Sequence, residues 1–158
     1  MSRLRKRVRS ERGAELIEFA LTLPLLLLLV LGIIEFGFLF QEYEVVTNSA
    51  REGARLAAMI PSAGYTTNNA TTRATDYLTA GGLDLAKAVP APTVVASQQA
   101  IAGTAPAKCE TAYTVTVTYQ HPVPFVSGIM SYFGGAIAQI PLKAVAVMRA
   151  EKSAVNCY

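Results

Sequence analysis

Residues 19–40 read FALTLPLLLLLVLGIIEFGFLF, and this stretch decides the fold. No residue from Phe19 to Ile34 is charged, and after Glu35 the apolar run resumes as far as Phe40. An α-helix of this length extends for roughly 33 Å, which is enough to cross the hydrocarbon core of a bilayer. We therefore predict one membrane-spanning helix.

The positive charges of the N-terminal region set the expected orientation of this helix. Six of them precede the apolar stretch, at Arg3, Arg5, Lys6, Arg7, Arg9 and Arg12. Because Lys and Arg stay on the cytoplasmic side of a membrane, we expect the N-terminus inside and the C-terminal part outside. The net charge of +3 thus comes from a basic tail and not from the surface of a folded domain. This distribution argues against a nucleic-acid-binding protein.

A cleaved signal peptide is the main alternative to a retained anchor. Such a peptide has a shorter apolar core, closely followed by small residues at the cleavage site. Here the core runs into Glu35, Phe36 and Phe38, and no suitable site precedes the alanines after Ser49. We therefore expect the helix to stay in the inner (cytoplasmic) membrane as a single pass.

Two residues inside the predicted span are unusual there. Pro24 cannot donate a backbone hydrogen bond to the carbonyl of Ala20, so the helix should bend. Glu35 places a carboxylate inside the apolar stretch, where a charge is costly and by default marks a functional position. The alternative is that Glu35 lies close enough to the outer interface to reach water, and at this stage both interpretations stay open.

The chain of 158 residues has room for one small domain after the span. Apolar and small residues recur at helical spacing up to Ile60, and Pro61 should end this first helix. A second helix is predicted at 70–80, and strands are predicted at 93–97, 113–119 and 142–150. The sequence therefore predicts an α+β fold, in which a long transmembrane helix continues into an outer domain with an antiparallel sheet of about three to four strands.

Residues 121–141 contain several prolines and glycines beside large apolar residues. We predict a long loop with a short helix, whose apolar side chains contact lipid or a partner. Folding back into the core of the domain is the alternative. The predicted organisation is a basic cytoplasmic leader at 1–13, a transmembrane and amphipathic helix at 14–60, and an extracytoplasmic α+β domain at 61–158.

The residue types needed for enzyme chemistry are sparse. The single histidine, His121, has no recognisable nucleophile near it in the sequence, and Asp76 and Asp84 are the only aspartates. We therefore expect no catalytic site and no cofactor. Cys109 and Cys157 lack the spacing of a zinc site, so no metal is expected either. One disulfide between them is expected in an oxidising compartment, and two unpaired thiols are the alternative.

The segment before the apolar run, Gly13-Ala14-Glu15-Leu16-Ile17-Glu18-Phe19, resembles the processing site of type IV-like prepilins, in particular those of the Tad (tight adherence, or Flp) pilus. In that family a prepilin peptidase cuts after the glycine and leaves a glutamate at the fifth position of the mature chain, followed by an aromatic residue. The resemblance implies cleavage between Gly13 and Ala14, with Glu18 and Phe19 at those two positions. Major Flp pilins are much shorter and usually have tyrosine in place of Phe19. The chain is thus more similar to TadE-type minor pilins, or pseudopilins, strongly over 12–58 and weakly beyond.

This resemblance implies a minor pilin that takes part in assembly or initiation of a Tad pilus for surface adhesion, located either in the membrane or within the pilus. The implied partners are other minor and major pilins, the prepilin peptidase, the pilus assembly platform and the lipid bilayer. A pair between the Ala14 ammonium and Glu18, within or between subunits, would favour one register of packed helices, because an unpaired charge near hydrocarbon is costly. Glu35 is a further candidate for such a role. The alternative function is an unprocessed, signal-anchored extracytoplasmic binding or adhesion module that does not polymerise.

Overall fold

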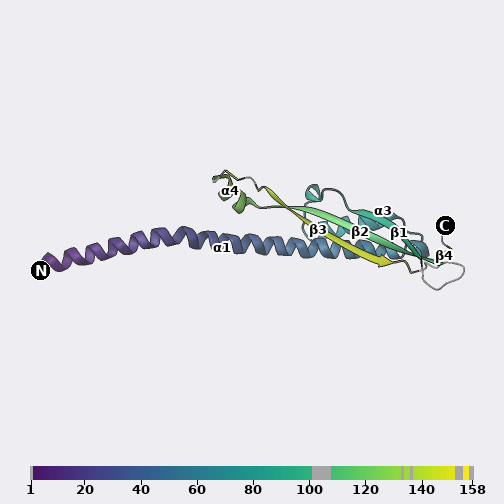
Figure 1. Ribbon diagram of the computed structural model, residues 1–158, viewed down its shortest axis with the longest axis horizontal. Helices are drawn as coiled ribbons and strands as arrows, with labels where there is room; N and C mark the ends of the chain where they lie inside the picture. Colours follow the sequence, from purple (N-terminus) through teal and green to yellow (C-terminus); the bar gives the residue numbers. More distant parts are fainter. Residues whose placement is uncertain (1, 101–107, 133, 136, 152–154, 157–158) are drawn as a thin grey trace.

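The computed structural model describes residues 2–100, 108–132, 134–135, 137–151 and 155–156. A single helix, α1 (Ser2–Ala58), runs far beyond the rest of the molecule. Its first half projects freely, and its second half lies along the sheet and a second helix (Figure 1). The sequence predicts a helix over 14–60, but in the structure the helix continues through the predicted leader.

Helix α1 ends close to the predicted position, but Pro61, which the sequence predicts as its end, is not the residue that ends it. The helix ends at Ala58, and the single turn α2 (Ile60–Ala63) follows with Pro61 in its first turn. A proline is well tolerated there, because the first N–H groups of a helix have no helical acceptor. Pro61 therefore helps to begin α2 and does not itself terminate α1.

The projecting half of α1 is curved (Figure 1). Pro24 lies inside this part of the helix, where it lacks the N–H that would bond to the preceding turn. Nearby, the Thr22 hydroxyl donates a hydrogen bond to the carbonyl of Phe19 at 3.2 Å. Proline and hydroxyl side chains bonded to the previous turn both favour bending of a helix.

The second helix, α3 (Thr67–Ala80), begins three residues earlier than predicted. Thr66 and Asn69 form a reciprocal capping box, in which Asn69 Oδ1 accepts from the Thr66 N–H at 2.9 Å. The usual residue at this third position is Glu or Gln, so the pattern is hard to see in the sequence. A short 3-10 helix, η1 (Leu85–Lys87), follows α3.

Three long strands form an antiparallel sheet in the order β1-β2-β3. They are β1 (Thr93–Ala100), β2 (Lys108–Pro122) and β3 (Gln139–Arg149), and a short β4 (Val155–Asn156) pairs with the beginning of β2. Together with the helices this confirms the predicted α+β class and the antiparallel sheet.

The short helix predicted within 121–141 is confirmed as α4 (Pro124–Tyr132), but the loop around it is shorter than predicted. The first two residues of the segment belong to β2, and its last three belong to β3. Pro122 is the last residue of β2, and Pro141 lies in β3, at the edge of the main three-strand order. Proline is tolerated at strand ends and in edge strands, since no ladder hydrogen bond from its nitrogen is required there.

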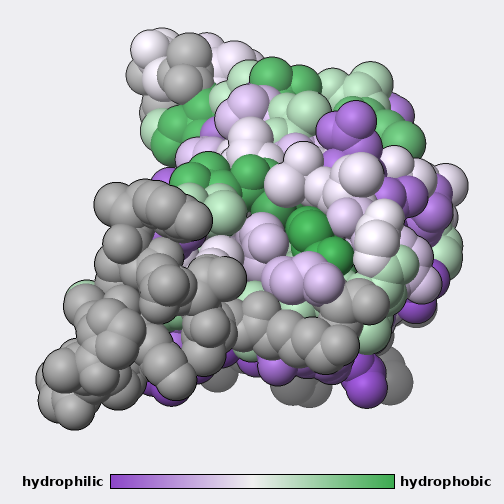
Figure 2. Space-filling model, turned by 90° about the vertical axis from the view of Figure 1, so that its right-hand side faces the viewer, coloured by the Kyte–Doolittle hydropathy of each residue, from purple (hydrophilic) through white to green (hydrophobic). Residues whose placement is uncertain are grey.

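The core lies between the second half of α1, helix α3 and one face of the sheet. Alternate residues of β2 point into it, and Val115 and Val117 are completely buried. The opposite side chains of β2, Thr114, Thr116 and Thr118, lie on the more exposed face. At the end of the molecule farthest from the N-terminus, hydrophobic and hydrophilic residues are interspersed on the surface (Figure 2).

Small residues allow α1 to approach α3 closely. A side chain at Gly53 would be crowded, because a Cβ there would lie 3.2 Å from the Ala70 oxygen, the Ala74 Cβ and Val115 Cγ1 alike. One turn earlier, the buried Ser49 hydroxyl donates to the Ala74 carbonyl at 2.7 Å. The second half of α1 is thus an integral part of the domain, and its position relative to the sheet is fixed.

Candidate functional site

The first half of α1 presents apolar side chains to its surroundings on all sides. No residue from Gly13 to Ile34 is buried, and Leu21 and Leu25 are 74% and 72% exposed. An apolar surface of this extent is not stable in water. The Gly13–Ala58 part of the helix also contains a segment long and apolar enough to cross a membrane. The helix therefore indicates a membrane anchor.

The predicted processing motif lies on this projecting part. The helix runs without a break through Gly13, Ala14 and Glu18, and a Cβ at Gly13 would meet nothing within 4 Å. Ala14 and Glu18 are exposed, and the Phe19 side chain is 60% exposed. The fold thus leaves the whole motif accessible to other molecules.

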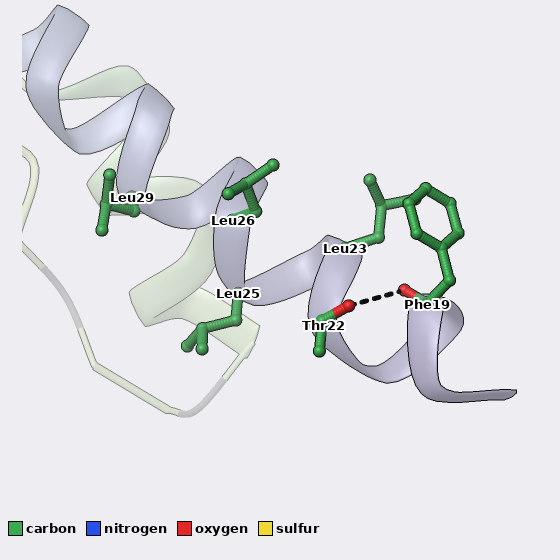
Figure 3. Close-up of a pocket in the computed structure, with 6 residues that line it drawn as sticks. All are labelled: Phe19, Thr22, Leu23, Leu25, Leu26 and Leu29. Atoms are coloured by element: carbon green, nitrogen blue, oxygen red, sulfur yellow. Dashed lines mark hydrogen bonds between the residues drawn. The ribbon is translucent and has the colours of Figure 1, made fainter. Parts of the chain in front are cut away.

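A shallow hollow of about 250 Å³ follows the motif on the helix surface. It is lined by Phe19, Thr22, Leu23, Leu25, Leu26 and Leu29. Figure 3 shows the Phe19 ring beside Leu23, one turn apart, while the Thr22 hydroxyl is turned toward the backbone. The hollow therefore offers almost entirely apolar contacts, as a lipid chain or a side chain of a neighbouring membrane helix would require.

Glu35 is covered by the domain of its own chain. Its side chain is only 6% exposed, and its Oε2 accepts a hydrogen bond from the Val126 N–H at 3.1 Å. Val126 lies in the first turn of α4, where backbone N–H groups lack helical acceptors. The carboxylate oxygen therefore caps the first turn of α4 from another element. The alternative that Glu35 reaches water does not describe this structure.

A second acidic residue of α1 contacts the same end of β2. Glu42 Oε2 lies 2.6 Å from His121 Nδ1, and His121 is 3% exposed. Residues seven apart lie on one face of a helix, so Glu35 and Glu42 both point toward the β2–α4 connection. We call Glu35, Glu42, His121 and Val126 the acidic clasp. The acidic clasp holds the β2–α4 connection against the middle of α1, between the apolar anchor and the part of α1 packed in the domain.

The environment of the clasp also affects a neighbouring tyrosine. Burial raises the pKa of Tyr119 above its ordinary value, and the negative charge of Glu42 raises it further. A backbone hydrogen bond at Asp84 opposes this shift without cancelling it. The Tyr119 hydroxyl therefore stays protonated beside Glu42 at neutral pH.

Removal of one partner tests the clasp. Glu42→Ala should lower the free energy of unfolding by about 1–3 kcal/mol, because it leaves the buried imidazole Nδ1 without its acceptor. Thermal unfolding in detergent micelles measures this effect. Glu44→Ala is the matched control, since Glu44 lies on the exposed side of the same turn. Equal stabilities of the two variants would show that the Glu42–His121 contact does not support the fold.

The sequence did not predict that the four residues of the acidic clasp come together. It singled out Glu35 by its depth in the apolar stretch, but it assigned no role to Glu42 or to His121. The spacing of the two glutamates on one helix face was an available signal. Their partners lie 91 and 79 positions along the chain, which no local pattern reveals.

The predicted disulfide is only partly within the described residues. Cys109 is 5% exposed at the beginning of β2, where its backbone pairs with Val155 of β4. Cys157 lies outside the described residues, so the pairing stays a prediction. Throughout the part of the chain that the structure describes, no group of three or more His, Cys, Asp or Glu side chains comes together as a metal site would require.

These features define a class of protein, one with a projecting apolar anchor helix whose second half is built into an α+β domain. Residues 13–55 match the family model of TadE-like proteins, which is consistent with a TadE-like pilin of the Tad system. The match covers the exposed motif, the anchor and most of the packed part of α1, and it confirms the resemblance expected for that segment. It indicates a Tad pilus-associated protein. No curated protein and no solved structure matches the chain.

Proposed function

We propose that this protein is a minor pilin, or pseudopilin, that takes part in assembly or initiation of a Tad pilus used for surface adhesion. The observation that carries the proposal is the position of the motif. Gly13, Glu18 and Phe19 lie on the projecting half of α1, within the segment that matches TadE-like proteins. Its proposed role is structural, without catalysis, metal or cofactor.

The projecting helix supplies what such a subunit needs. In the proposed orientation the basic leader is cytoplasmic, the anchor crosses the inner membrane, and the domain lies outside. A prepilin peptidase would remove residues 1–13 and create an ammonium group at Ala14. The exposed Glu18 carboxylate can pair with that group on a neighbouring pilin, and the hollow beside Phe19 can receive an apolar side chain of the same neighbour. Other minor and major pilins and the assembly platform are the proposed partners.

Intact mass measurement of the protein extracted from membranes tests the processing step. In cells with the cognate prepilin peptidase, the chain should begin at Ala14. Gly13→Leu should retain the leader, because a bulky residue replaces the glycine at the cleavage position. Gly37→Leu serves as the control, since Gly37 is also an open helical position in α1 and should not affect cleavage.

The same measurement separates the two candidate functions. An intact leader in the unaltered protein, together with its absence from sheared pilus fractions and from crosslinks to other pilins, would support an anchored binding module that does not polymerise. A chain that begins at Ala14 and crosslinks to other pilins supports the minor pilin.

A further inference from the structure

Helix α4 carries an unusual apolar surface for an outer domain. Residues 122–142 contain no Asp, Glu, Lys or Arg. No residue of α4 is buried, and Phe125 and Val126 are 43% and 37% exposed. Ile137 before β3 and Ile140 at the beginning of β3 add to this surface and are 42% and 37% exposed. Water is therefore a poor environment for this part of the domain.

The position of α4 relative to the anchor identifies what covers this surface. Figure 1 shows α4 beyond the end of the sheet, alongside the middle of α1. The hydrogen bond from the Val126 N–H to Glu35 fixes the first turn of α4 at the level of Glu35. Glu35 precedes Phe40, the outer end of the apolar stretch, by five residues, or about 7.5 Å along the helix. The apolar surface of α4 thus continues the apolar surface of the anchor.

Several polar groups of α4 form hydrogen bonds within the chain. The hydroxyls of Ser127 and Ser131 donate to the carbonyls of Pro124 and Gly128 at 3.0 and 2.8 Å. At the C-terminal end, the Gly135 N–H returns to the Met130 carbonyl at 2.7 Å. At the other end, Glu35 accepts from the first turn. An exposed polar group without a partner is costly in a bilayer, so internal hydrogen bonds of this kind suit a helix that lies in lipid.

We propose that α4 inserts into the outer leaflet of the bilayer and forms a second membrane contact beside the transmembrane helix. The helix has nine residues and is about 13.5 Å long, too short to cross the bilayer. Its first turn, held at the level of Glu35, lies near the outer edge of the hydrocarbon. The two contacts hold the domain close to the membrane surface. This contact depends on the membrane anchor and not on the proposed role in a pilus.

A tryptophan reporter tests the insertion, because the chain contains no tryptophan of its own. Full-length Phe125→Trp is reconstituted into phosphatidylcholine–phosphatidylglycerol vesicles with or without bromine on the acyl chains. Its emission should be blue-shifted and mostly lost in brominated lipid, and aqueous iodide should quench it little. Val147→Trp, at a position 60% exposed on the outer face of the sheet, should show the opposite behaviour.

Two results would overturn the proposal. Quenching of Phe125→Trp by iodide but not by brominated lipid would place α4 in water. Protection from both quenchers would mean that protein, such as a second copy of this chain, covers α4. Tyr132→Trp provides a second reporter on the same helix if Phe125→Trp does not fold. Adding Glu35→Ala to the reporter should reduce quenching by brominated lipid, since α4 then loses its cap and its attachment to the anchor.

Discussion

Glu18→Ala is expected to leave removal of the leader intact and to abolish most assembly with other pilins. Cleavage depends on Gly13 and the membrane boundary, whereas the register of packed helices depends on the carboxylate. In the variant, the Ala14 ammonium of a neighbouring subunit has no partner near hydrocarbon, where an unpaired charge is costly. We expect at least about a tenfold loss of crosslinked subunits, which a change of only ~1.4 kcal/mol per contact would produce.

Two further variants separate charge from shape and position. Glu18→Gln keeps atoms that can form hydrogen bonds but cannot form the ion pair, so it should also assemble poorly. Glu15→Ala removes an equally exposed carboxylate one turn earlier and should assemble normally. Leader removal is followed by immunoblot, and assembly by crosslinking to the other pilins. Normal crosslinking of Glu18→Ala would exclude the register role and leave only the sequence resemblance at this position.

Gly53→Leu should have the largest effect on the fold. A Cβ alone would already approach backbone and side-chain atoms of α3 and β2 at 3.2 Å, and a leucine adds three further carbon atoms at this crowded position. Helix α1 must then move away from α3, which also breaks the buried Ser49–Ala74 hydrogen bond. We expect a loss of about 3 kcal/mol or more, a large part of the stability of a small domain. Thermal unfolding in micelles and protease sensitivity of the domain measure it.

Gly32→Leu is the matched control for this substitution. Gly32 lies in the same helix, and a Cβ there would meet nothing within 4 Å. Both substitutions add the same volume and the same helix propensity, so only the surroundings differ. A similar loss of stability at both positions would show that the close approach of α1 and α3 is not what makes Gly53 necessary.

Much of this protein could be predicted from short-range patterns. An apolar stretch of 22 residues, interrupted only by Glu35, predicts a membrane helix, because length and hydropathy decide whether a segment can span a bilayer. The alternation of threonine with valine and tyrosine at 113–119 predicts a strand with one buried face, and β2 has that face. The motif at Gly13–Phe19 is likewise local, and its resemblance to TadE-type proteins agrees with the family match.

Only the tertiary structure decided how the domain is attached to its anchor. The partners of Glu35 and Glu42 come from the β2–α4 connection, far along the chain, and prolines there made the sequence resemble a loop. The need for glycine at position 53 likewise depends on atoms of α3 and β2 that meet it only in the folded chain. Local propensity specifies which segments are helix or strand, but the surface that each segment faces depends on long-range packing. For that reason the sequence determined the apolar anchor helix and its motif, while the fold determined that Glu35 caps α4 and holds this apolar helix beside α1.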